Sequence, residues 1–268
     1  MGEYNKFQTS KPHRIGYALS GGFIKGFAHL GVMQALLEHD IKPDIISGVS
    51  AGALAGVFYA DGYEPYHALE IFNGYKFMDL TSWALTKTGF FKLDDFKSFL
   101  NTNLKHSKIE DMPIPLIVTA TDLDHGRCVQ FRKGDVAERI AASCCMPVMF
   151  TPVNIDGVNY VDGGIFKNLP VSIIRKECEK VVAINVSPLN TGKYKMNVLD
   201  IALRSYHFMF RANTFPDREN SDLLIEPYGL KGYGNRELGK AEEIFNHGYV
   251  SANRVLNKLI QEKETVWK

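Results

Sequence analysis

The segment Gly-Val-Ser-Ala-Gly at residues 48–52 joins two kinds of secondary structure. Residues 44–47 contain a β-branched pair and predict a strand, whereas the small residues 53–60 predict a helix. A strand that turns directly into a helix at Gly-x-Ser-x-Gly is sharply bent, and its glycines let a neighbouring backbone approach. Such a turn holds the serine hydroxyl at its tip, so Ser50 is a candidate nucleophile.

Short apolar segments alternate with helical patterns along the rest of the chain. Strands are predicted at residues 15–20, 115–121, 159–161, 181–186 and 222–226, and helices at 135–145, 171–177, 197–213 and 238–263. This alternation is typical of an α/β fold with three layers, in which helices cover both faces of a mostly parallel central sheet. No repeat or linker divides the sequence, so we expect a single domain over residues 15–268 after an N-terminal extension, residues 1–14.

Composition excludes several classes of protein. The 31 basic and 30 acidic residues leave a net charge of +1, which gives no indication of nucleic-acid binding. Residues 1–14 lack the apolar core of a signal peptide, and no apolar run approaches the roughly 18–20 residues of a membrane span. The four cysteines show no metal-ligand spacing. We therefore expect a cytoplasmic protein without a metal or other cofactor, and its oligomeric state stays open.

A second glycine-rich turn, residues 21–26, follows the first predicted strand. Its backbone N–H groups and the start of the next helix suit an oxyanion, and a plain tight turn or a phosphate loop are the alternatives. The Walker phosphate-binding pattern ends in Gly-Lys followed by Ser or Thr, and it is absent here because Lys25 is followed by Gly26. A cation near a helix start is unfavourable unless an anion lies nearby, so Lys25 is either a surface lysine or a functional one.

A serine nucleophile needs a base to accept its proton. Asp162 follows a predicted strand and precedes Gly163 and Gly164, which places it on a tight turn at the end of a strand, where ligand sites of open α/β sheets lie. An α/β-hydrolase would instead use a late histidine, and only His207 and His247 occur late enough. Both lie within helical patterns rather than in a loop after a strand, so we favour Asp162.

Three blocks in this order resemble the patatin-like phospholipases: residues 20–26, residues 48–52 and the Asp-Gly-Gly at residues 162–164. Shorter agreements extend the resemblance over residues 15–260. It implies a patatin-like fold and a Ser50–Asp162 dyad without histidine. It further implies an acyl-enzyme on Ser50, hydrolysis of fatty-acyl esters of lipids or phospholipids, and no calcium requirement.

The resemblance also implies roles for the glycine-rich segments. By this analogy the oxyanion hole comprises Gly21, Gly22 and Phe23. The supporting motif positions are Lys25, Gly26, Gly48, Gly52, Gly163 and Gly164.

Phe23 departs from this resemblance, because the family carries a third glycine there. A positive φ is costly for phenylalanine, so either φ is negative at this position or the oxyanion hole is altered and activity is weak. The ring can also narrow an acyl pocket. A weakly active lipid- or acyl-binding protein is therefore a third interpretation, beside a patatin-like hydrolase and an α/β-hydrolase.

An aspartate base must be a stronger base than an ordinary carboxylate, whose pKa is near 3.9. Because burial raises a carboxyl pKa, we expect an apolar, water-poor environment around Asp162.

Two apolar segments are candidates for lipid contact. The aromatic-rich residues 75–99 can wall an acyl pocket or touch a bilayer, and the helix near residues 199–210 can be interfacial or contact another subunit. We favour ordinary core packing for both. Besides the lipid substrate, a transient contact with a membrane surface is the remaining partner expectation.

Overall fold

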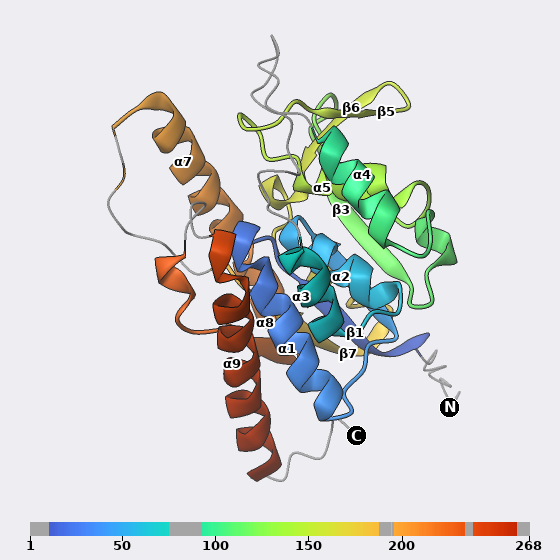
Figure 1. Ribbon diagram of the computed structural model, residues 1–268, viewed down its shortest axis with the longest axis vertical. Helices are drawn as coiled ribbons and strands as arrows, with labels where there is room; N and C mark the ends of the chain where they lie inside the picture. Colours follow the sequence, from blue (N-terminus) through green and yellow to red (C-terminus); the bar gives the residue numbers. More distant parts are fainter. Residues whose placement is uncertain (1–10, 75–92, 188–193, 195, 234–237, 262–268) are drawn as a thin grey trace, which may run out of the picture.

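The structure is a computed structural model that describes residues 11–74, 93–187, 194, 196–233 and 238–261 (Figure 1). The strands are β1 (His13–Leu19), β2 (Ile45–Val49), β3 (Leu116–Asp122), β4 (Arg127–Phe131), β5 (Val153–Ile155), β6 (Val158–Asp162), β7 (Cys178–Ile184) and β8 (Leu223–Ile225). The α-helices are α1 (Phe27–Glu38), α2 (Ala51–Ala60), α3 (Pro65–Asn73), α4 (Asp94–Asn103), α5 (Val136–Cys144), α6 (Val171–Ile174), α7 (Val198–Ala212), α8 (Phe215–Glu219) and α9 (Ala241–Gln261). Short 3-10 turns include η1 (Phe23–Gly26), η4 (Gly163–Ile165), η5 (Leu230–Gly232) and η6 (Leu238–Lys240).

The strands form one eight-stranded sheet in the order β5-β6-β3-β2-β1-β7-β8, with β4 paired to β3 outside this path. The pairs among β3, β2, β1, β7 and β8 are parallel, whereas β4, β5 and β6 join by antiparallel pairs. Helices lie against both faces of the sheet (Figure 1). The predicted mostly parallel α/β sheet is confirmed.

The two faces of the sheet carry layers of unequal thickness. On one face Tyr17 and Leu19 join the large core under α1, α2, α3 and α9. On the other face Ala18 and Ile117 pack with Ile174 of the short helix α6. Side chains alternate between these cores along each strand, and the central strands are almost wholly apolar because both faces are covered.

Most predicted elements are present with shifted ends. β1 begins at His13, before the expected start of the domain, because His13 is already paired with Cys178 of β7. The Arg14 and Ile15 N–H groups both donate to Asp44 Oδ2 at 2.8 Å. The helix predicted from residue 135 is α5, whose first turn is capped by a hydrogen bond from the Glu138 N–H to Asp135 Oδ1 at 2.8 Å.

Two predicted helices are shorter than expected. The helix predicted at 171–177 ends at Ile174, since β7 begins only four residues later at Cys178. The C-terminal helix predicted from residue 238 is α-helical only from Ala241, because the 3-10 turn η6 comes first.

Helix α7 is not part of the core. None of its described side chains is buried, and Val198 is 85% exposed. Figure 1 shows the helix projecting away from the sheet. The expectation of core packing for this helix is therefore wrong, because an amphipathic pattern shows which face is apolar but not what covers it.

Helices α1 and α9 cross at two glycines. A Cβ on Gly31 would lie 2.0 Å from the Phe245 carbonyl oxygen, and a Cβ on Gly248 would lie 2.2 Å from the Ala28 carbonyl oxygen. The two backbones therefore touch directly, and this contact secures α9 against the layer that carries the site.

We expect Gly31→Ala to lower the free energy of unfolding by about 1–3 kcal/mol, because the added methyl group must push the two helices apart. Urea denaturation measures the effect. Gly239→Ala is the matched control, since no atom lies within 4 Å of its added Cβ. Equal stability of the two variants would contradict direct backbone contact.

Candidate active site

The pairing of β3 brings Ser50 and Asp162 together. β4 occupies one edge of β3 along residues 118–122, so β2 and β6 share the other edge. On that edge Val49 is paired with Thr119, and Asp162 is paired with the next residue, Ala120. The residue after β2 and the last residue of β6 are therefore neighbours, although 112 positions separate them in the sequence.

Ser50 lies on the sharp turn that the sequence predicts. Its backbone has φ 52° and ψ −125°, in the left-handed region that non-glycine residues rarely adopt. The neighbouring glycines are required by close packing, because a Cβ on Gly52 would lie 2.3 Å from the Leu19 carbonyl oxygen, and one on Gly48 would lie 2.7 Å from Ala53.

Ser143 holds this strained turn in place. The Ser50 N–H donates to Ser143 Oγ at 2.8 Å, and the Ser143 hydroxyl donates to the Thr119 carbonyl oxygen at 2.7 Å. Ser143 is fully buried, so it links the turn to β3 without a contribution from solvent.

Asp162 is 1% exposed, in agreement with the dry environment expected for it. Its Oδ1 accepts the Gly164 N–H at 2.8 Å, and the Ser50 hydroxyl lies close enough to this carboxyl to favour its ionised form. Burial raises the pKa of Asp162 to about 6, and the Ser50 hydroxyl and the Gly164 N–H oppose this rise only in part. The carboxyl is thus a stronger base than an ordinary aspartate and lies beside a serine hydroxyl.

Asn168 joins the Asp162 turn to the glycine-rich loop. Its carbonyl oxygen accepts the Gly21 N–H at 3.1 Å, and its side-chain amide donates to Ser187 Oγ at 3.2 Å. The Ser187 hydroxyl donates in turn to the Gly21 carbonyl oxygen. Because the Gly21 N–H already donates to the Asn168 carbonyl oxygen, this group stabilises the loop itself.

Gly22 and Phe23 follow Gly21 in the loop. No hydrogen-bond acceptor for the Gly22 N–H lies among the described residues. Phe23 has φ 53°, so of the two expectations for this position the negative φ is wrong. Its ring lines the cavity beside Ser50, as expected for a side chain that narrows a pocket.

Lys25 is 7% exposed and is therefore not a surface lysine. Burial lowers the pKa of its ammonium group. The next residue, Gly26, allows the loop to pack on the serine helix, because a Cβ there would lie 2.8 Å from the Ala51 Cβ.

Three buried polar residues around the site were not predicted from the sequence: Ser143, Asn168 and His29. The His29 Nε2–H donates to the Ser20 carbonyl oxygen at 2.8 Å, and burial lowers the pKa of this imidazole to about 4, so the ring is neutral. The only signal for Ser143 and Asn168 was their place in two of the shorter segments that resemble the patatin-like phospholipases, residues 142–147 and 168–171. Their hydrogen bonds depend on contacts between distant elements.

The two late histidines lie on helices, as their patterns indicated. His207 belongs to α7, and His247 belongs to α9, where its Nε2 lies 3.2 Å from the Tyr233 hydroxyl. Neither lines the cavity at Ser50.

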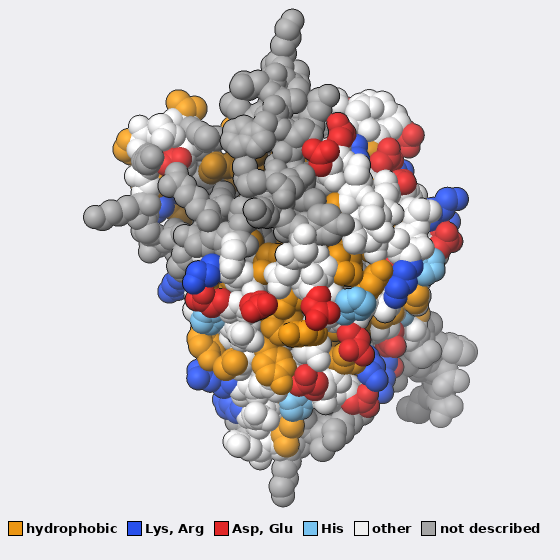
Figure 2. All heavy atoms as spheres, in the orientation of Figure 1, with side chains coloured by type: hydrophobic (Ala, Val, Ile, Leu, Met, Phe, Trp, Pro, Cys, Tyr) orange, Lys and Arg blue, Asp and Glu red, His pale blue; other side chains and the backbone are white. Residues whose placement is uncertain are grey.

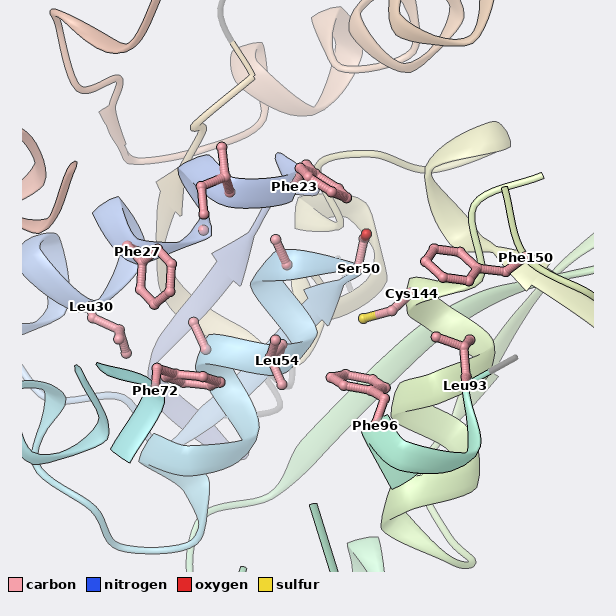
Figure 3. A pocket seen from close by; sticks show the side chains of 14 residues that line it. Phe23, Phe27, Leu30, Ser50, Leu54, Phe72, Leu93, Phe96, Cys144 and Phe150 are labelled. Carbon is pink, nitrogen blue, oxygen red and sulfur yellow. The ribbon is translucent and has the colours of Figure 1, made fainter. Parts of the chain in front are cut away.

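An apolar cavity of about 110 Å³ opens beside Ser50. Figure 3 shows the Ser50 hydroxyl at the edge of the cavity, with Phe23, Cys144 and Phe150 close by. Leu54 points into the cavity from α2, the helix that follows Ser50. The cavity is lined by Phe23, Ile24, Gly26, Phe27, Leu30, Ser50, Ala51, Leu54, Ala55, Phe72, Leu93, Phe96, Cys144 and Phe150. Such a lining suits an alkyl chain rather than a polar ligand.

Of the aromatic-rich segment 75–99, residues 75–92 lie outside the described part of the chain. Phe96 lines the cavity, and Phe99 is buried in the core. Within the described ranges, no three metal-ligating side chains converge, and no helix is long and apolar enough to span a membrane.

The fold and the serine turn define the class, an α/β protein with a Gly-x-Ser-x-Gly turn facing a buried aspartate. The family model described as "Patatin-like phospholipase" matches residues 17–174, more than half of the chain. The chain therefore belongs to the patatin-like phospholipase family.

Curated relatives extend the same similarity. The chain is 29% identical over 190 residues to the "Uncharacterized NTE family protein Rv1063c" of Mycobacterium tuberculosis, which covers 70% of this chain and 53% of that protein. It is 26% identical over 298 residues to "Lysophospholipase NTE1" of Kluyveromyces lactis, which covers 96% of this chain and 20% of that protein. The chain thus spans about half, or less, of the length of these relatives.

A solved structure shares the fold. The crystal structure of VipD from Legionella pneumophila superimposes with a TM-score of 0.59 at 15% identity, covering 92% of this chain and 67% of that chain. At this identity the likeness shows the fold alone.

We expect Asp162→Asn to stabilise the protein increasingly as the pH rises. The folded-state pKa of about 6 lies above the ordinary 3.8, so ionising this carboxyl lowers the free energy of unfolding. The loss begins at about pH 4 and is complete above pH 6. The stability gain of Asp162→Asn over wild type should be about 2 kcal/mol larger at pH 8 than at pH 4.5. Urea denaturation of both proteins at each pH measures this difference. The titration of His29 contributes equally to both proteins, so it cancels in the comparison. A gain that does not change with pH would contradict a raised pKa.

Proposed function

We propose that this protein is a serine acyl hydrolase that cleaves fatty-acyl esters of lipids, including phospholipids, through a Ser50–Asp162 dyad. The proposal rests on one observation: a serine hydroxyl on a strained turn lies beside a buried carboxyl of raised pKa at the edge of an apolar cavity. Membership of the patatin-like phospholipase family and the name of the Kluyveromyces lactis relative support a lipid ester as the substrate.

In the first step the Ser50 Oγ attacks the ester carbonyl while Asp162 accepts the hydroxyl proton. The carbonyl oxygen becomes an oxyanion, and the N–H groups of Gly22 and Phe23 are its proposed donors. When the tetrahedral intermediate collapses, the alcohol leaves with the proton from Asp162 and the acyl group remains on Ser50.

The second step returns the enzyme to its starting state. A water molecule gives a proton to Asp162 and attacks the acyl-enzyme carbonyl, and the same N–H groups stabilise the second oxyanion. The fatty acid then leaves as Ser50 regains its proton. A buried Asp162 suits both steps because a base with a pKa near the working pH accepts and returns a proton readily.

The apolar cavity is the proposed binding site for the acyl chain. Phe23 lines it beside Ser50, and Leu54 lies on α2, one helical turn beyond Ser50. We further propose that the enzyme acts in the cytoplasm and meets its substrate during transient contact with a membrane surface.

The dyad is tested by Ser50→Ala and Asp162→Asn, each of which should lower turnover of a short-chain nitrophenyl ester by at least about a thousandfold. A fluorophosphonate probe should add one adduct to the wild type by intact mass, and none to Ser50→Ala. Near wild-type turnover by Asp162→Asn would rule out the dyad.

The same assays separate the two other interpretations. A large loss of turnover in His207→Ala or His247→Ala would indicate an α/β-hydrolase triad instead. No adduct on wild-type Ser50 would indicate a lipid- or acyl-binding protein, for which the strained backbone of Phe23 would be the structural reason.

The pH dependence of kcat/KM should follow Asp162. Because the carboxyl accepts a proton only when ionised and its pKa is about 6, kcat/KM should reach a plateau above that pH and fall to about a tenth at pH 5. A soluble ester at a concentration below KM gives the profile directly. A midpoint that moves in His247→Ala would assign the titration to another group.

Filling the cavity should change chain-length preference. We expect Leu54→Trp to lower kcat/KM for a sixteen-carbon acyl ester by at least about tenfold, with much less effect on a four-carbon ester. Leu123→Trp is the control, because Leu123 is 50% exposed and does not line the cavity. Equal losses on both esters would contradict an acyl-chain site.

A further inference from the structure

Helix α7 carries an apolar stripe that no described part of the protein covers. Val198, Ile201, Phe208 and Met209 are 85%, 42%, 43% and 37% exposed, respectively. Their spacing of three, seven and one residues places them on one side of the helix. Figure 2 shows hydrophobic side chains at the outer end of this helix. Large apolar side chains gathered on a projecting helix mark an interaction surface.

Basic side chains border the stripe. Arg204 and Arg211 lie on the neighbouring row of the helix, and their guanidinium groups lie over the rings of Phe208, at 5.1 Å, and Phe215, at 5.7 Å. Asp200, the acidic residue of α7, lies on the same row as these arginines, one helical turn before Arg204. An apolar stripe bordered by arginines is typical of helices that lie in the interface of an anionic membrane.

The base of the helix is joined to the turn that carries Asp162. The Asn213 side-chain amide donates to the Gly164 carbonyl oxygen at 2.7 Å, and its Oδ1 accepts the Asn168 N–H at 2.8 Å. The ring of Phe210 packs on the same turn, 3.4 Å from the position of a Cβ on Gly164. A surface bound by α7 is therefore held next to the site.

We propose that α7 docks the protein on an anionic lipid surface, with Val198, Ile201, Phe208 and Met209 inserted among the acyl chains and Arg204 and Arg211 at the level of the phosphates. The inference deepens the function proposed above and rests on it for the identity of the substrate. Docking through α7 delivers a lipid ester beside Ser50, since the helix and the Asp162 turn are one connected unit.

The test is vesicle sedimentation with the Ser50→Ala protein, so that binding does not depend on turnover. Vesicles of phosphatidylcholine are compared with vesicles that also contain phosphatidylglycerol. We expect tighter binding to the anionic vesicles and a loss of at least tenfold in the triple variant Val198→Gln, Ile201→Gln and Phe208→Gln. Arg204→Gln with Arg211→Gln should weaken binding only to the anionic vesicles, by about fivefold for each charge at low salt.

The matched control removes equally exposed apolar side chains elsewhere. Leu123, Val250 and Ile260 are 50%, 48% and 59% exposed, and their replacement by Gln should leave vesicle binding within twofold of the parent protein. A second readout is the single variant Phe208→Trp, whose added fluorescence should shift to shorter wavelength when anionic vesicles are supplied. The single change also avoids any loss of folding in the triple variant.

Three results would overturn the inference: vesicle binding that survives the triple change, equal loss in the control triple, or a dimer in light scattering that the α7 triple dissociates. The last result would assign the face to a second copy of the chain. Failure of the proposed function is distinct, because wild-type protein that turns over no soluble ester but binds vesicles through α7 would contradict the dyad and leave the docking face intact.

Discussion

The divided edge of β3 is the constraint on which the site depends. Because β2 pairs with this edge as far as Thr119 and β6 takes over at Ala120, the strand ends that carry Ser50 and Asp162 meet at one point. An antiparallel β6 is required, since only a strand that arrives from the opposite direction can end against the end of β2. The mixed character of the sheet is therefore what assembles the site.

That junction is costly for the chain. Ser50 and Phe23 both adopt positive φ angles, and Asp162 is a carboxyl removed from water. Strain of this kind persists only where surrounding contacts hold it, and here buried hydrogen bonds through Ser143 and Asn168 do so. Stability and proposed chemistry oppose each other at Asp162, because the burial that destabilises its carboxylate also makes it a useful base.

Much of the fold was predictable from local pattern. The alternation of apolar strands and helices, the capping pair Asp135 and Glu138 and the sharp turn at Ser50 are all read from neighbouring residues, and the structure contains each of them. The helix at α7 was also predicted, but its surroundings were not. Periodicity identifies an apolar face, whereas burial depends on which distant elements reach it, and the described elements leave every described side chain of α7 at least partly exposed.

Local sequence by itself determined the family, the type of each motif and the identity of the two candidate dyad residues, because each depends on a few adjacent side chains. Only the tertiary structure decided that the Gly21 N–H supports the loop, that Phe23 takes a positive φ and that Asp162 has a pKa of about 6. The physical reason is that hydrogen-bond partners and desolvation come from segments far away in the chain, and they exist only once β3 has brought those segments together.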